Sequence, residues 1–429
     1  MKKLHKLWQN FTNSEEKKAL WTNFFSLSTI QAFGYALPLL TIPYVVRVVG
    51  TELYGTAAFA LAVAAFFTVI VDYGFNLTAT REASINRSDM GYLSQLYAAV
   101  MSVKFILLLL GFSVLMGVSY LFPEFGGGFK ILIAAYSVVL GQALFPAWLF
   151  QGLERMRAFT LFSVIPRILA AAAVFILIKK PADVFWVPAL QGLGGIVSGL
   201  LGIIVAWKSL GLRLVRPTLS LIKSQLKNGW PVFLSNFGIN TYINSNIVIL
   251  GLVASPSAVG FYAVAEKLVS SVRGVLVILF QSIYPRACLR AHKGKSLQTY
   301  YKKIILMSAL LFGTVALLMW FFAPQIIWLI SGKYVPQSAT VLKILAFVPV
   351  IVLLNIPPYQ MLLMFKRNSE LSFLVIAGAI FNISLNILLS RWYFEVGTAI
   401  TVLITELIIT LGFYIIYWRK NIMSIFHKK

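Results

Sequence analysis

Long runs of apolar residues recur from residue 20 to residue 418, and short polar segments separate them. An α-helix that crosses the hydrocarbon core of a bilayer needs about 20 such residues. Because backbone groups in lipid must be hydrogen-bonded within the segment, runs of this length are helical. We predict twelve spans, at residues 24–46, 54–79, 97–121, 129–151, 158–178, 184–207, 229–253, 258–286, 304–322, 338–364, 370–390 and 395–418.

The composition agrees with a membrane protein and excludes several other classes. Hydrophobic residues make up 59% of the 429 residues and charged residues only 12%. The one cysteine, Cys288, excludes an intramolecular disulfide. The three histidines lie outside the predicted spans, so we expect no metal site, and we also expect no cofactor. The basic start of the chain lacks the cleavage site of a signal peptide and resembles a short amphipathic cytoplasmic segment.

The distribution of positive charge predicts the orientation. One set of loops together with both termini holds 26 of the 37 Lys and Arg residues, and the opposite set of loops holds six. Since positive loops stay inside, both termini are predicted to lie in the cytoplasm. The net charge of +24 is then a topology signal and an attraction to anionic lipid. It is not evidence for nucleic-acid binding.

The longest polar segment divides the predicted spans into two sets of six. A short internal repeat supports this division, because Gly55-Thr-Ala-Ala-Phe-Ala60 opens the second span and Gly260-Phe-Tyr-Ala-Val-Ala265 opens the eighth, 205 residues later. Parallel repeats of this kind place a substrate at the interface between the halves. The predicted fold is an all-α polytopic membrane protein with two six-helix bundles around a central cavity. Its parts are a cytoplasmic segment 1–22, bundles 23–207 and 229–418, a basic cytoplasmic linker 208–228 and a basic tail 419–429.

The eighth span carries charges at membrane depth. Tyr262, Glu266, Ser270 and Arg273 fall on one helical face, whereas Lys267 lies about 100° away. Charges within a membrane nearly always face a water-filled cavity or another charge. We therefore expect this face to line a transport pathway.

The charges inside all spans have a positive surplus. They are Lys104, Arg167, Lys267, Arg273 and Lys343 against Asp72, Glu266 and Glu406. A cavity with a positive surplus attracts an anionic ligand, and arginine presents a rigid fork to phosphate oxygens. The alternative is structural pairing, for instance of Asp72 with Arg273, while Lys343 can reach the interface. The three carboxylates are candidate sites for a coupling ion, because a buried carboxylate takes up a proton near neutral pH.

Amide side chains form a further pattern. Asn236, Asn240 and Asn244 are spaced four residues apart in the seventh span, which suits hydrogen bonds to the hydroxyl groups of sugars. Together with Tyr262 they are the candidate sugar-binding residues. The alternative is that such amides join helices to one another, and we favour it for Asn382 and Asn386. Prolines within spans, among them Pro146 and the pair Pro357-Pro358, predict helix kinks.

Four stretches together resemble one family. They are Pro43-Tyr44 with Arg47-Val-Val-Gly50 and Tyr54-Gly55, Asp72-Tyr-Gly-Phe75 with Ala79-Thr-Arg81-Glu82, Pro146-Ala-Trp148 through Met156, and Gly260-Phe-Tyr262 with Ala265-Glu-Lys267. These stretches resemble motifs of bacterial polysaccharide flippases. That family comprises the O-antigen and capsule repeat-unit translocases of the Wzx type. It falls within the superfamily of multidrug, oligosaccharidyl-lipid and polysaccharide exporters.

The resemblance implies an activity and a location. An undecaprenyl-diphosphate-linked oligosaccharide would be moved across the bacterial cytoplasmic (inner) membrane by alternating access, for surface polysaccharide synthesis. It adds Arg47 and Arg81 to the candidate diphosphate-binding residues Arg273, Arg167, Lys104 and Lys267, although both lie at span ends, where a lipid-headgroup or topology role is an equal alternative. A proton or sodium ion, a polysaccharide polymerase and a chain-length regulator are the candidate partners.

Two other functions compete with a flippase. A cation-coupled multidrug antiporter would share the fold, but such proteins typically carry a carboxylate in the first span, and span 24–46 has none. A membrane glycan polymerase or ligase needs a large outer loop with acid–base groups, whereas every predicted outer loop is short. The sequence therefore favours a transporter that is not an enzyme.

Overall fold

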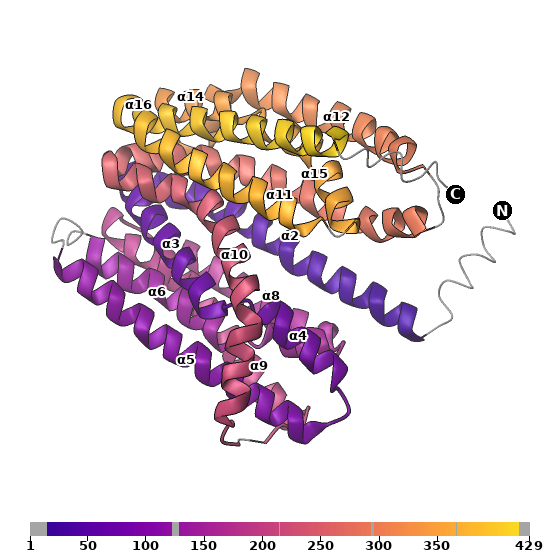
Figure 1. The fold of residues 1–429 in the computed structure, drawn as a ribbon. Helices are drawn as coiled ribbons and strands as arrows, with labels where there is room; N and C mark the ends of the chain where they lie inside the picture. The colour runs from indigo at the N-terminus through magenta and orange to yellow at the C-terminus, as the bar shows by residue number, and fades with distance from the viewer. Residues whose placement is uncertain (1–14, 122–127, 214, 293–295, 366, 420–429) are drawn as a thin grey trace, which may run out of the picture. The chain divides into compact units, whose positions relative to one another are not determined.

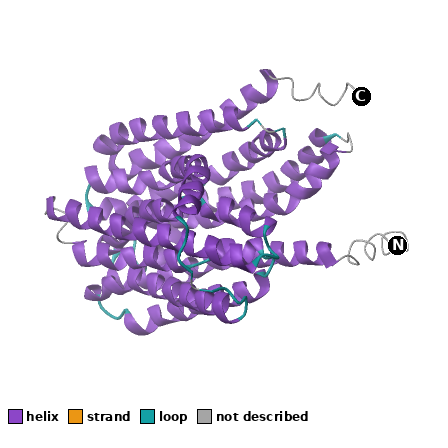
Figure 2. Ribbon diagram, turned by 60° about the horizontal axis from the view of Figure 1, so that its bottom comes forward, coloured by secondary structure: helices purple, strands orange, loops and turns teal. Residues whose placement is uncertain are grey.

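The structure, a computed structural model, describes residues 15–121, 128–213, 215–292, 296–365 and 367–419. Most of the predicted segment 1–22 and of the tail 419–429 lies outside the described residues. Within the described ranges all regular elements are helical and none is a strand (Figure 2). In chain order they are α2 Glu15–Val49, α3 Thr51–Asp72, α4 Phe75–Ile85, α5 Met90–Leu121, α6 Phe129–Leu144, α7 Ala147–Gly152, α8 Met156–Leu177, η2 Pro181–Phe185, α9 Trp186–Lys208, α10 Leu219–Val253, α11 Pro256–His292, α12 Leu297–Phe321, α13 Ala323–Ser331, α14 Pro336–Leu345, α15 Val348–Met364 and α16 Asn368–Arg419.

The helices are consistent with the predicted twelve spans. In the described part of the chain, nine helical stretches are long and apolar enough to cross a membrane. The last of these lies in α16 and corresponds to two predicted spans. The backbone at Phe394 is non-helical with φ 48° and ψ −128°, so α16 consists of two arms that meet at this residue. Helices α10 and α11 have 35 and 37 residues, so they are long enough to cross, although their polar residues lower their mean hydropathy. The predicted class of polytopic all-α membrane protein is confirmed.

Two breaks interrupt spans in the first part of the chain. The predicted kink at Pro146 is confirmed, since α6 ends at Leu144 and α7 begins directly after the proline. A second break separates α3 from α4, where Tyr73 and Gly74 have positive φ of 48° and 80°. A Cβ on Gly74 would lie 2.8 Å from the Val232 Cβ. Both the conformation and the space therefore favour glycine at this position.

The described chain divides into two compact units, of which unit 1 comprises residues 1–34, 64–176 and 185–236. Its core contains the fully buried side chains of Leu93, Trp148 and Phe150. Helices α5 and α6 lie side by side (Figure 1), and α6 packs along α9 through glycines. A Cβ on Gly141 would lie 2.7 Å from the Gly195 carbonyl carbon. Such a close backbone approach through small residues is typical of membrane helices.

Described residues of the predicted linker 208–228 pack against the rest of unit 1. Leu210 and Leu212 are buried in its core, and the backbone N–H of Arg213 donates to the Ser94 hydroxyl at 3.1 Å. Helix α10 begins at Leu219, within the predicted linker. The linker is therefore short and docked, and its second half extends the following helix.

Unit 2 comprises residues 35–63, 177–184 and 237–429. Helix α11 packs against α14, α15 and α16, and α15 packs along α16. The end of α2 and the start of α3 belong to this unit, so the compact units are drawn differently from the predicted bundles 23–207 and 229–418. Those bundle boundaries stay a prediction.

Candidate functional site

Arg273 of α11 lies between two carboxylates in unit 2. Its Nη2 atom is 3.7 Å from the Glu266 Oε1 atom, and its Nη1 atom is 3.8 Å from the Glu406 Oε1 atom. Glu266 is two helical turns before Arg273 on the same helix, as the predicted polar face requires. Glu406 comes from the second arm of α16, after the break at Phe394. One guanidinium is thus shared by two acids.

These three residues line a small cavity in unit 2. The cavity measures about 20 Å³. A volume of this size is room for one water molecule. The polar residues Tyr242, Asn246 and Tyr262 also line it. In this conformation the cavity is far too small for a sugar or a diphosphate, although it has the size and the polar lining for a single water molecule or a bare cation.

Amide groups hold the walls of this cavity in place. The Asn355 Nδ2 atom of α15 donates to the Glu406 Oε2 atom at 3.2 Å. The other oxygen of this carboxylate, Oε1, is the one that faces Arg273. Asn386 donates to the Asn246 Oδ1 atom at 3.1 Å, and Asn382 donates to the Thr405 hydroxyl at 3.2 Å. Both of these α16 amides are fully buried. Asn386 joins α16 to α10, and Asn382 joins the two arms of α16 on either side of Phe394, so both have the helix-joining role favoured for them from the sequence.

Lys104 and Asp72 form an ion pair within unit 1. The Lys104 Nζ atom of α5 lies 3.4 Å from the Asp72 Oδ1 atom at the end of α3, next to the break at Tyr73 and Gly74. Lys104 is only 1% exposed. A buried lysine with a carboxylate this close keeps its charge balanced. Lys104, like Arg273, is therefore a candidate diphosphate ligand whose charge is already paired.

Arg167 of α8 is half-buried and differs from the paired cations Lys104 and Arg273. Among the described residues no carboxylate oxygen lies within 4.0 Å of it. Its guanidinium carbon lies 5.7 Å from the centre of the Phe145 ring. This is the geometry of a cation–π contact. An aromatic face stabilises a cation without neutralising it, so the positive charge of Arg167 stays available to an anion.

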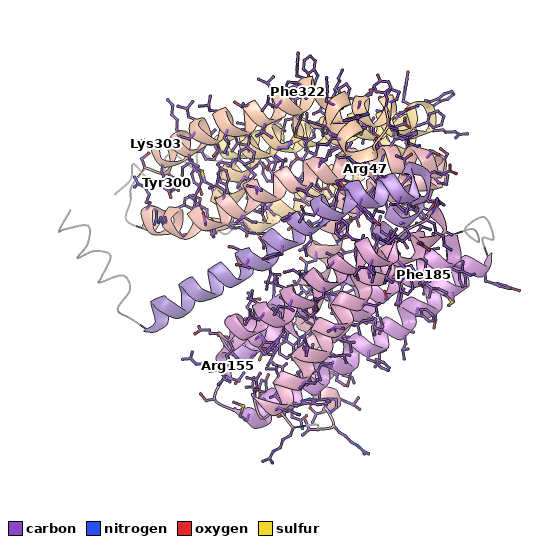
Figure 3. The ribbon with its side chains drawn as sticks, turned by 180° about the vertical axis from the view of Figure 1, so that it is seen from behind. Arg47, Arg155, Phe185, Tyr300, Lys303 and Phe322 are labelled. Atoms are coloured by element: carbon purple, nitrogen blue, oxygen red, sulfur yellow. The ribbon has the colours of Figure 1, made fainter. Side chains whose placement is uncertain are left out.

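The remaining predicted cations have varied surroundings. Lys267 is half-buried on α11, and within the described part of the chain it too has no ion pair with a carboxylate. Arg81 is exposed on α4. Arg47, at the end of α2 (Figure 3), donates from Nε to the Ile330 carbonyl oxygen at 3.3 Å and from Nη2 to the Leu329 carbonyl oxygen. Both carbonyls lie in the last turn of α13, where a cation interacts favourably with the negative end of the helix dipole.

The predicted sugar-binding amides lie along α10. Asn244 donates to the Asn240 Oδ1 atom at 3.0 Å, so these two side chains bind each other one turn apart. Asn236 lies one turn earlier and is half-buried. Tyr262 is buried and lines the small cavity beside Glu266. The role of these four residues in sugar binding stays a prediction.

Sequence reasoning missed two polar residues that line the unit 2 cavity, Tyr242 and Asn246, and one that supports it through Glu406, Asn355. Tyr242, Asn246 and Asn355 lie within predicted spans, but nothing in their spacing separates them from other polar residues. Their position beside Glu406 depends on how α10, α15 and α16 pack. One signal was available, since Asn355 is an amide inside an apolar run, two residues before the proline pair of α15.

Comparison with known proteins identifies similar sequences and folds. Two curated proteins, each named "Putative O-antigen transporter", are similar over nearly their full length. The one from Escherichia coli K12 is 28% identical over 410 residues, covering 94% of this chain and 98% of that protein. The one from Shigella dysenteriae is 27% identical over 394 residues, covering 91% and 98%.

Solved structures show the same fold at low sequence identity. The lipid II flippase MurJ in an inward closed conformation has a TM-score of 0.71 at 14% identity, covering 94% of this chain and 89% of that one. An inward-facing multidrug resistance transporter of the MATE family has a TM-score of 0.65 at 14% identity, covering 95% and 96%. Finally, the sequence profile of a family described as polysaccharide biosynthesis protein matches residues 20–288. The chain is a multi-pass membrane protein that belongs to this polysaccharide biosynthesis protein family.

Proposed function

We propose that this protein is an O-antigen or capsule flippase of the bacterial cytoplasmic membrane. It moves undecaprenyl-diphosphate-linked oligosaccharide units from the inner to the outer leaflet by alternating access, and it is not an enzyme. The names of the two full-length relatives and the family of the chain support this class. In this role both termini face the cytoplasm, as the distribution of Lys and Arg predicts.

The observation that carries the proposal is the charge of Arg167, which no carboxylate in the described part of the chain balances. Lys104 is balanced by Asp72, and Arg273 is balanced by two acids, so these cations have little charge left for a substrate. Arg167 has an aromatic neighbour in place of an acid. In a setting of low dielectric constant an unbalanced guanidinium attracts and orients phosphate oxygens. We therefore assign the diphosphate to Arg167 and rank Lys104 and Arg273 below it.

The acid-rich cluster in unit 2 has a different role in this proposal. Glu266 and Glu406 together carry one more negative charge than Arg273 can balance. With room for one water molecule beside them, they suit a proton or a sodium ion. We propose that this cluster couples export to a cation gradient, whereas Asp72 is held by Lys104.

The test is restoration of surface polysaccharide in a strain that lacks its own O-antigen flippase. The wild-type chain should restore the surface glycan, and Arg167→Gln should lower it by about tenfold or more, because a charge-assisted contact is lost. Arg167→Lys keeps the charge without the fork and should retain part of the activity. Lys343→Gln is the matched control, since the Lys343 Nζ atom lies over the Trp320 ring at 6.0 Å. Normal surface glycan in Arg167→Gln, at equal protein levels, would contradict this assignment.

A multidrug antiporter is the second candidate, because the acid pair of unit 2 and the MATE-like fold suit cation-coupled export. The same strain distinguishes the two functions. A flippase restores surface glycan and leaves drug susceptibility unchanged. An antiporter raises the tolerated concentration of cationic drugs and leaves the glycan defect in place.

A further inference from the structure

A groove of about 520 Å³ in unit 2 is separate from the cavity at Arg273. Helix α2 lines it with Leu39, Leu40 and Pro43, α11 with Leu268, and α13 with Ile326 and Leu329. Leu40 of α2 is 67% exposed and Leu329 of α13 is 61% exposed, so an occupant of the groove can contact apolar side chains on both helices. An apolar groove of this kind is chemically complementary to an apolar chain.

Arg47 is the charged residue of this groove and lies at one end of it. The run from Leu39 to Arg47 in α2 extends about 12 Å along the helix axis. The two bonds of Arg47 to carbonyls of α13 fix its guanidinium but use only two of its five N–H donors. The side chain is also exposed. A fixed, exposed guanidinium at the end of an apolar groove is complementary to a ligand with one anionic head and one long apolar tail.

We propose that this groove binds the isoprenoid tail of a polyprenyl diphosphate, with a phosphate oxygen at Arg47. The inference rests on the proposed function, which supplies a lipid of this chemistry. The predicted topology puts Arg47 on the outer side, so the groove serves the lipid after translocation. The groove is a binding site for the tail and is distinct from the head-group contact at Arg167.

The test measures lipid retained by the purified full-length protein. Protein in detergent is incubated with undecaprenyl phosphate and phosphatidylglycerol together, and both are quantified after gel filtration. Leu40→Trp fills the groove from α2 and Leu329→Trp fills it from α13. Leu317→Trp is the matched control, because Leu317 is a 59% exposed leucine of α12 outside the groove.

Leu40→Trp and Leu329→Trp should each lower retained undecaprenyl phosphate by about tenfold. This is the change expected when roughly two methylene groups of the lipid tail are no longer buried in the groove. Retained phosphatidylglycerol and the control should not change. Unchanged undecaprenyl phosphate in a groove variant that elutes like wild type would overturn the inference. Equal loss of both lipids would also overturn it, since the groove would then hold ordinary phospholipid. Wild-type restoration of surface glycan tests the proposed function separately, so the two failures are distinguishable.

Discussion

Gly55 of α3 and Gly260 of α11 pack backbone against backbone in unit 2, and their contacts are reciprocal. A Cβ on Gly55 would meet the Pro256 carbonyl oxygen, and a Cβ on Gly260 would meet the Thr51 carbonyl oxygen. Each glycine is 205 residues from the other, and so are Thr51 and Pro256. Reciprocal contacts between equivalent residues are the signature of a local two-fold relation. The contact supports the repeat that the sequence indicates at these positions.

The first prediction is that alanine at either glycine destabilises the protein. The added Cβ of Gly55→Ala would lie 2.6 Å from the Gly260 backbone nitrogen. A side chain could relieve this clash by changing its rotamer, but a backbone atom cannot. Overpacking of this kind costs about 1–3 kcal/mol. The measurement is the thermal unfolding temperature in detergent. Gly313→Ala is the control, because no atom lies within 4 Å of its Cβ position. Equal melting of Gly55→Ala and Gly313→Ala would contradict the close packing.

The second prediction concerns the ion pair of Lys104 and Asp72. Lys104→Met leaves the Asp72 charge without its partner, which should cost about 3–5 kcal/mol. The double variant Lys104→Met/Asp72→Leu removes both charges and should recover most of that stability. Thermal unfolding of the four proteins measures the coupling. If the pair is structural, the double variant also exports surface glycan. A stable double variant without export would instead indicate that Lys104 contacts the substrate.

Apolar runs were sufficient to predict the helices, because hydrocarbon allows few other structures. Even α10 and α11 were predicted, although their polar residues lower their hydropathy. The break at Pro146 was predictable because proline lacks an N–H group. The break at Tyr73 was not, since it depends on positive φ at two residues and on how Gly74 packs against Val232.

The partners of the charged residues were beyond sequence reasoning. Helical periodicity places Glu266 beside Arg273 because both lie on one face of α11. Glu406 is far along the chain, and only the packing of α16 against α11 brings it to the same guanidinium. Likewise, the spacing of polar residues suggested Arg273 as a partner of Asp72, whereas the structure pairs Asp72 with Lys104. Residue types could be predicted, but ion pairs between helices require the fold.

The third prediction concerns the proline pair of α15. Pro358 has no N–H group, so the Leu354 carbonyl loses its usual partner four residues later. The Tyr414 hydroxyl of α16 donates to this oxygen at 3.2 Å. Tyr414→Phe should therefore cost about 0.5–1.5 kcal/mol in the wild-type chain. In a Pro358→Ala background the helix supplies the bond again, so the same change should cost less. Thermal unfolding of the double-mutant cycle measures this difference, and an equal cost in both backgrounds would exclude the compensation.

The fourth prediction concerns stability at the guanidinium shared by Glu266 and Glu406. Glu266→Gln or Glu406→Gln alone leaves Arg273 one carboxylate, so each should cost about 1 kcal/mol. The double variant leaves a half-buried cation without either counter-charge, and such a loss costs about 3 kcal/mol or more. The cost of the double variant should therefore exceed the sum of the single costs by about 1 kcal/mol or more, which thermal unfolding of the cycle measures. Simple additivity would show that the acids do not share the cation.

The last prediction separates the two acids by function. The Glu266 side chain is 24% exposed and that of Glu406 is 5% exposed, so an ion from the cavity reaches Glu266 more easily. Asn355 also fixes Glu406 through its second oxygen, which leaves it less free to exchange a ligand. Export of surface glycan in Glu266→Gln should thus lose its response to external pH and sodium, because glutamine neither titrates nor carries charge. Glu406→Gln should keep that response at a lower level of stable protein. If Glu406→Gln loses the response and Glu266→Gln keeps it, the coupling role belongs to the buried acid, and exposure is the wrong guide to the ion's path.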